Sequence, residues 1–251
     1  MLKRCLALFC VAAACASAQT TIYFDDFSGS SSTDLTGTTP DISSGGATWI
    51  ADTGGSAWKA DGSISNSGAS NAFLSFAPSA GHVYTLSIDA NPVNGNGDWF
   101  AIGFSQLATV NSIYAGGSVS ASAWMLLRGD RTDDLETFLG PGTGDEVDFN
   151  PPDDITLSPG SVNLKVILDT TGAQWTAEWV VNNVSIRQTT FDTNPTINYV
   201  GLGRWSTASG TVDNFTLTST SAIPEPATCA LTLGTLAAGA VMLRRRRRRP
   251  V

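Results

Sequence analysis

The chain has 251 residues and a formal net charge of −8; only 14% of the residues are charged and 25 are glycine. This length accommodates one sizeable domain or two small ones, and the glycine content is typical of a turn-rich chain and not of a mostly helical one. The basic residues concentrate at the two ends, so residues 19–222 are considerably more acidic than the whole chain. Such a surface repels nucleic acid and attracts divalent cations, which excludes nucleic acid as a partner.

The first segment, residues 1–18, has the pattern of a secretory signal peptide. Lys3 and Arg4 form a short basic region, Leu6–Ala14 an apolar core, and Ala16–Ala18 a small-residue cleavage site before Gln19. We therefore expect an exported protein that begins at Gln19.

A lipoprotein signal is the alternative for the same segment, with Cys15 as the acylated residue. That site lacks the leucine preferred three residues before the cysteine, so cleavage after Ala18 is the stronger interpretation. The other cysteines lie in the signal or, as Cys229, in the tail, which leaves residues 19–222 without one. An exported domain without disulfides must be held together by its core, helped in some proteins by bound cations.

Residues 19–222 are predicted to form one antiparallel β-sandwich. Short apolar or alternating runs recur between turn-forming residues, and no stretch sustains a 3.6-residue period. Asn182–Asn183 predicts a tight hairpin turn because asparagine tolerates positive φ, whereas Ser28–Gly46 is expected to be a long loop or a set of weak edge strands. The expected strands are Thr21–Phe27, Ala72–Phe76, His82–Ala90, Asp98–Ser105, Ser122–Arg128, Val162–Asp169, Gln174–Val181, Val184–Phe191, Asn198–Trp205 and Thr211–Thr218.

The order of these strands resembles the concanavalin A-like or laminin G-like jelly roll. Tyr23–Phe27 opens the domain, Val212–Leu217 closes it, and Leu164–Gln188 has the hairpin pattern of such domains. The resemblance implies an all-β jelly-roll fold. That fold is shared by lectins, carbohydrate-binding modules, glycan-cleaving enzymes and adhesion domains, so it does not define a function.

The strongest catalytic candidate is the acidic stretch around Glu146 and Asp148. Laminarinase-like glycoside hydrolases of this fold carry Glu-x-Asp-x-x-Glu, but Pro151 occupies the position of the second glutamate. Retaining hydrolysis needs two carboxyl groups about 5 Å apart, so we expect an acidic loop and no catalytic residue. His82 is the only histidine and has no motif partner, which favours an ordinary strand position over a catalytic triad or a zinc site.

Three aromatic residues are candidates for glycan binding: Trp99, Tyr199 and Trp205. In both of their strands one face is apolar, while the opposite face combines these aromatics with glycine and alanine. An open floor flanked by rings could stack on sugars. The alternative is that the aromatics fill a second packed layer, as tryptophan and tyrosine commonly do in sandwiches. Trp175 and Trp179, which share one face, are assigned to the core.

Calcium is the predicted cofactor, in a structural role. Asp25 and Asp26 end the first strand, and Asp213 with Asn214 lie in the last one, which jelly rolls commonly place beside the first. Calcium prefers about six to eight oxygen ligands, and these side chains offer them. The alternative is a set of strand-end acids that face water.

The C-terminal segment, residues 223–251, combines three features in order. Pro224, Glu225 and Pro226 come first, and Ala227–Leu243 follows with 17 uncharged residues, roughly 25 Å as a helix. A basic cluster ends the segment and should stay cytoplasmic under the positive-inside bias; it consists of Arg244, Arg245, Arg246, Arg247, Arg248 and Arg249. A permanent single-span anchor is one interpretation of this segment.

This combination resembles the sorting signal of bacterial PEP-CTERM proteins. The resemblance implies transient anchoring in the inner membrane, recognition by an exosortase, cleavage near the Pro-Glu-Pro motif, and delivery to the cell surface or an extracellular polysaccharide matrix. The two prolines keep the motif extended, as a cleavage site requires. The sequence therefore predicts a non-catalytic surface protein that associates with an extracellular polysaccharide or cell-surface glycan. A purely structural matrix protein and a divergent glycoside hydrolase are the alternatives.

Overall fold

The computed structural model describes residues 18–53, 57–63, 69–93, 99–109, 121–128, 135–139, 147–149, 161–205 and 209–222. Gln19–Thr220 form one compact unit with its own hydrophobic core, so this unit has what a domain needs to fold by itself. The predicted signal peptide up to residue 17 and the predicted sorting signal at 223–251 lie outside the described residues. Within the described ranges, no helix is long and apolar enough to cross a membrane.

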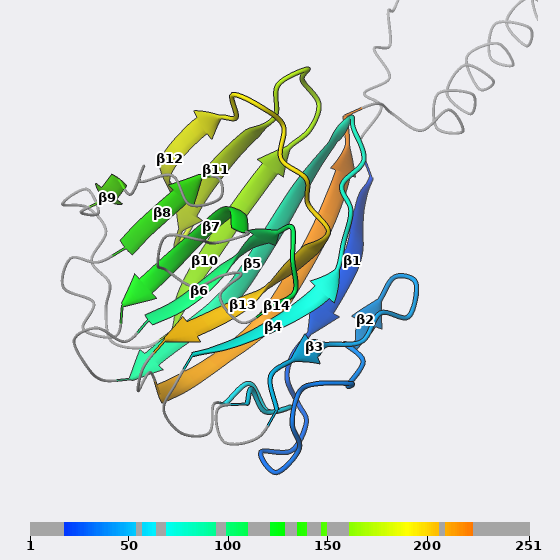
Figure 1. Ribbon diagram of the computed structural model, residues 1–251, viewed down its shortest axis with the longest axis vertical. Coiled ribbons are helices and arrows are strands. Elements are labelled where there is room, and N and C mark those ends of the chain that lie inside the picture. Colours follow the sequence, from blue (N-terminus) through cyan, green and yellow to red (C-terminus); the bar gives the residue numbers. More distant parts are fainter. Residues whose placement is uncertain are drawn as a thin grey trace, which may run out of the picture. The chain divides into compact units, whose positions relative to one another are not determined.

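The described strands form two antiparallel sheets that pack face to face, as Figure 1 shows. The first sheet has the order β12 (Val184–Thr190), β11 (Thr176–Val181), β10 (Val162–Asp169), β5 (His82–Val93), β14 (Ser209–Ser221), β1 (Gln19–Asp25) and β2 (Ile42–Ser43). The second sheet has the order β3 (Ile50–Ala51), β4 (Ser70–Ser75), β13 (Tyr199–Trp205), β6 (Trp99–Ser105), β7 (Ala121–Arg128), β8 (Leu135–Leu139) and β9 (Val147–Phe149). The predicted all-β sandwich is confirmed.

The core lies between the sheets because alternate residues of each strand face inward. Strand β10 shows this period directly, since every second residue from Val162 to Leu168 is buried. Phe100, Ile102 and Phe104 of β6 are fully buried in the same cluster. Each such side chain contributes roughly 1.5–3 kcal/mol when it is withdrawn from water.

Trp179 links the two sheets in the core, as its assignment from the sequence predicted. It is fully buried on β11, and its indole Nε1 donates a hydrogen bond of 2.8 Å to the backbone oxygen of Trp124 on β7. The guanidinium of Arg187 lies 5.3 Å from the Trp179 ring centroid and donates to Thr137 Oγ1 on β8 at 3.0 Å. Trp175 is partly buried against the same core. Both sheets are thereby fixed in one lateral position.

The predicted hairpin turn is confirmed. Asn182 and Asn183 join β11 to β12 with φ angles of 48° and 67°, the positive values that a two-residue turn of this kind requires. The expected loop at Ser28–Gly46 contains the short edge strand β2 and runs past the end of the core. Within and just after it, Leu35 and Trp49 are buried, so this loop closes one end of the sandwich.

The acidic stretch after residue 144 differs from the expected loop. Residues 147–149 form the edge strand β9, and Asp148 stands opposite Glu136 of β8. The sequence prediction underestimated Val147 and Phe149, whose alternation suits a short edge strand. Glu146 and Pro151 themselves lie outside the described residues.

Candidate functional site

Three carboxylates gather where β1 ends. Asp25, Asp26 and Asp41 each offer an oxygen, and these oxygens lie within 4.8 Å of one another. Asp26 and Asp41 are exposed, whereas Asp25 is only 8% exposed. The loop that closes the sandwich brings Asp41 back to the first strand, where its Oδ2 accepts a hydrogen bond of 3.0 Å from the backbone N–H of Asp26.

Asp25 is held in place from two sides. Its Oδ2 accepts a hydrogen bond of 2.7 Å from Nε1 of the buried Trp49, and its Oδ1 accepts one of 2.8 Å from the backbone N–H of Phe27. Burial raises the pKa of Asp25, and the two hydrogen bonds offset part of that increase. The pKa of Asp26 is instead lowered, mainly by its hydrogen bonding to Ser28. A buried and an exposed carboxylate therefore meet at one point, which is an arrangement that a cation would stabilise.

The predicted partners from the last strand are placed elsewhere. Strands β1 and β14 do pair, with Asp25 opposite Phe215. However, Asn214 has a φ of 53°, and its Nδ2 donates a hydrogen bond of 2.9 Å to Asp89 Oδ2 on β5. The structure does not bring Asp213 or Asn214 into the carboxylate cluster. Asp41 takes that place, and no sequence signal marked it because it lies in a loop without strand register.

The outer face of the second sheet is the face for which the sequence left two interpretations, an open floor and a packed layer of aromatics. A Cβ atom added to Gly103 would lie 2.3 Å from Cβ of Trp124, and one added to Gly201 would lie 2.6 Å from Cδ1 of Phe73. At both glycines these close contacts favour the packed layer over the open floor. The ring of Phe73 lies against Gly201, whereas Cβ of Trp124 and the backbone of β7 lie against Gly103.

A second hydrophobic cluster accordingly lies on this outer face. The ring of Trp124 stacks on that of Phe138 with a centroid distance of 3.8 Å and an interplanar angle of 9°. Trp99 belongs to the same cluster and is only 3% exposed. The structure thus places Trp99 in a packed layer, which was the alternative interpretation of this residue.

The other two aromatic candidates remain at the surface. Trp205, at the end of β13, is 38% exposed and pairs across the strands with Trp99. Tyr199, at the beginning of β13, is half-buried and meets Phe73 edge-on at a centroid distance of 6.2 Å. Along an extended strand at about 3.3 Å per residue, the two rings are separated by roughly 20 Å on one face.

His82 is an ordinary strand residue, as predicted. It begins β5, its Nδ1 lies 3.0 Å from Ser219 Oγ, and its ring stacks on Tyr84 at 5.7 Å. These contacts tie two neighbouring strands of the first sheet together. Among the described residues no carboxylate hydrogen-bonds to the imidazole, so the Ser219 contact is not part of a Ser-His-acid triad.

No protein-family model and no curated protein matches the chain. Among solved structures, the fold is similar to an endo-1,3-beta-glucanase from Streptomyces sioyaensis, with a TM-score of 0.56, 14% identity, and coverage of 82% of this chain and 98% of that one. It is also similar to the carbohydrate recognition domain of Emp47p, with a TM-score of 0.50, 15% identity, and coverage of 82% and 97%. The described unit is thus a concanavalin A-like jelly-roll β-sandwich, which confirms the resemblance stated for its fold.

Proposed function

We propose that the protein is an exported, non-catalytic surface protein whose β-sandwich associates with extracellular or cell-surface glycan. The observation that supports glycan association is the pair of surface aromatics on β13, because Tyr199 and Trp205 present two rings on one face of a rigid sheet. Sugar rings stack on such side chains through their C–H faces, and the separation suits an extended chain better than a single sugar.

The two terminal segments support a proposal for how the protein reaches the cell surface. The signal peptide at residues 1–18 directs export, and the segment from Pro224 to Arg249 holds the protein in the inner membrane until an exosortase cleaves it. The mature protein is then released to the cell surface or to the extracellular polysaccharide matrix.

A structural calcium ion is proposed at the carboxylate cluster. A cavity of about 200 Å³ adjoins the cluster, and carboxylate-bearing, hydroxyl-bearing and apolar residues share its lining: Asp25, Ser28, Gly29, Leu35, Thr38, Thr39, Asp41 and Ala60. The carboxylate oxygens of Asp25, Asp26 and Asp41 fit calcium, which binds hard oxygen ligands in irregular geometry. The ion would neutralise the carboxylates and hold the closing loop against β1. The set replaces the predicted Asp213 and Asn214 with Asp41.

A glycan array probed with residues 19–222 tests the proposed function. Binding to one or a few related polysaccharides is expected, and Trp205→Ala and Tyr199→Ala should each weaken it. Val184→Ala is the matched control, because Val184 is an exposed hydrophobic residue (44%) on the first sheet. An array without any binding would instead favour a purely structural matrix protein, and equal losses in all three variants would contradict the assignment to β13.

A further inference from the structure

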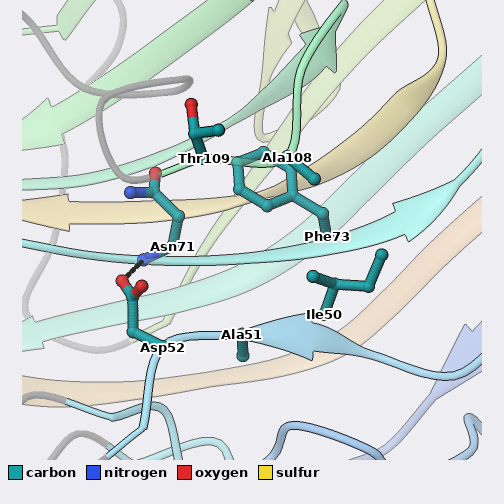
Figure 2. A pocket seen from close by; sticks show the side chains of 7 residues that line it. All are labelled: Ile50, Ala51, Asp52, Asn71, Phe73, Ala108 and Thr109. Atoms are coloured by element: carbon teal, nitrogen blue, oxygen red, sulfur yellow. Dashed lines mark hydrogen bonds between the residues drawn. The ribbon is translucent and has the colours of Figure 1, made fainter.

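A small cavity opens on the outer face of the second sheet, where β3 pairs with β4 (Figure 2). Its volume is about 70 Å³, several times the roughly 10–15 Å³ that one water molecule needs. The cavity is lined by Ile50, Ala51, Asp52, Asn71, Phe73, Ala108 and Thr109. Apolar and polar side chains thus share one space that is large enough for part of a ligand.

Asn71 is the unusual member of this lining. It is only 2% exposed, yet neither Nδ2 nor Oδ1 of its amide has a hydrogen-bond partner in the part of the chain that the structure describes. Its backbone N–H is satisfied by Asp52 Oδ2 at 3.0 Å, and Figure 2 shows the amide on the opposite side, toward Thr109. An unsatisfied buried polar group costs about 1–3 kcal/mol, so an apolar residue would serve packing better here.

The amide defines the chemistry of a partner. It needs a group that donates to Oδ1 and accepts from Nδ2 side by side. A trans acetamido group points its N–H and its C=O in opposite directions within one plane and cannot do both, whereas two hydroxyls on adjacent carbons can. Asp52 in the lining and the acidic domain disfavour an anionic sugar, and Phe73 and Ile50 offer apolar contact for a sugar's C–H groups.

We propose that Asn71 forms a subsite for a vicinal hydroxyl pair of a neutral sugar. The subsite deepens the proposed function and rests on it. It also adjoins the β13 surface, because the ring of Phe73 contacts the ring of Tyr199. A glycan that stacks on Tyr199 therefore places a neighbouring unit beside the cavity.

Nuclear magnetic resonance on ¹⁵N-labelled residues 19–222 tests the subsite. The probes are the methyl glycosides of glucose, mannose and galactose, each compared with its 3-deoxy analogue, which lacks both vicinal secondary pairs. We expect the side-chain amide signals of Asn71 to shift with at least one parent glycoside and not with its analogue. Equal shifts with the analogue, or no shift with any glycoside, would overturn the proposal.

Two matched variants separate binding from a purely structural role. Asn71→Ala should weaken the glycoside affinity at least about tenfold, through the loss of two hydrogen bonds, without lowering the melting temperature. Asn163→Ala should lower the melting temperature and leave binding intact, because Nδ2 of Asn163 donates to Asp89 Oδ1 at 2.8 Å. A drop in melting temperature for Asn71→Ala with unchanged binding would mean that the amide has only a structural role, as the hydrogen-bond partner of a buried water.

The two proposals fail in different ways. If the array is positive and the amide of Asn71 does not respond, the subsite is refuted and glycan association stands. If no glycan binds on the array and the amide signals of Asn71 do not shift, glycan association is refuted, and the subsite is refuted with it.

Discussion

Replacing Gly103 by alanine is expected to destabilise the sandwich. The new Cβ atom would lie 2.3 Å from Cβ of Trp124 and 2.5 Å from the backbone oxygen of Ala123, whereas unstrained carbon atoms approach to about 3.5–4.0 Å. Overpacking of this kind costs about 1–3 kcal/mol. We expect the upper part of that range because one contact is a backbone carbonyl of a paired strand, which cannot rotate away.

Alanine also lowers the conformational entropy of the unfolded chain, which offsets about 0.4–1 kcal/mol of this cost. The net decrease in the free energy of unfolding is then about 2 kcal/mol. For a domain of this size the melting temperature should fall by about 4–8 °C, measured by circular dichroism or calorimetry. Gly172→Ala is the control, since that glycine lies in an exposed loop that can adjust. If the two variants have the same melting temperature, Trp124 does not lie against Gly103 and the outer face is open at that position.

Three further predictions concern processing, activity and metal binding. Mass spectrometry of the protein from its native host should show no residues beyond the Pro-Glu-Pro region, and an intact arginine tail on the surface form would establish a permanent anchor instead. The purified domain should release no reducing sugar from β-glucans because Pro151 replaces the second carboxylate; hydrolysis that Glu146→Gln abolishes would favour the enzyme alternative. Calcium at about a hundred times its dissociation constant should stabilise the domain by about 2.7 kcal/mol. Asp41→Ala should remove this effect and Asp213→Ala should not; identical melting curves in calcium and in chelator would exclude the ion.

Much of the fold could be predicted because a strand or a tight turn produces a pattern among residues that are close in sequence. The two-residue period placed Phe100, Ile102 and Phe104 on the core face, and the Asn182–Asn183 pair located a hairpin from the backbone preference of asparagine alone. These inferences need only neighbours in sequence, and the structure confirms them.

The site could be predicted less well because it depends on contacts distant in sequence. The period of a strand tells which residues share a face but not what lies against that face, so it could not decide between an open floor and the packed layer at Gly103 and Gly201. The pairing of the first and last strands led to the prediction that Asn214 lies near the carboxylates. In the structure Asn214 has a positive φ, and its side chain hydrogen-bonds to Asp89 instead. Asp41 and the unpaired amide of Asn71 become visible only when the loop and the sheet edge are in place.

The position of β14 in the first sheet has a consequence for the timing of folding. This last strand lies between β5 and β1, so β1 cannot join the rest of its sheet until β14 is present. The hydrogen bond from Gln19 Nε2 to Thr218 Oγ1 spans 199 positions of sequence, and contacts of such range make folding slow. If the chain is exported from its N-terminus, as proposed, the domain therefore stays incomplete, and accessible to proteases and chaperones, until β14 has crossed the membrane.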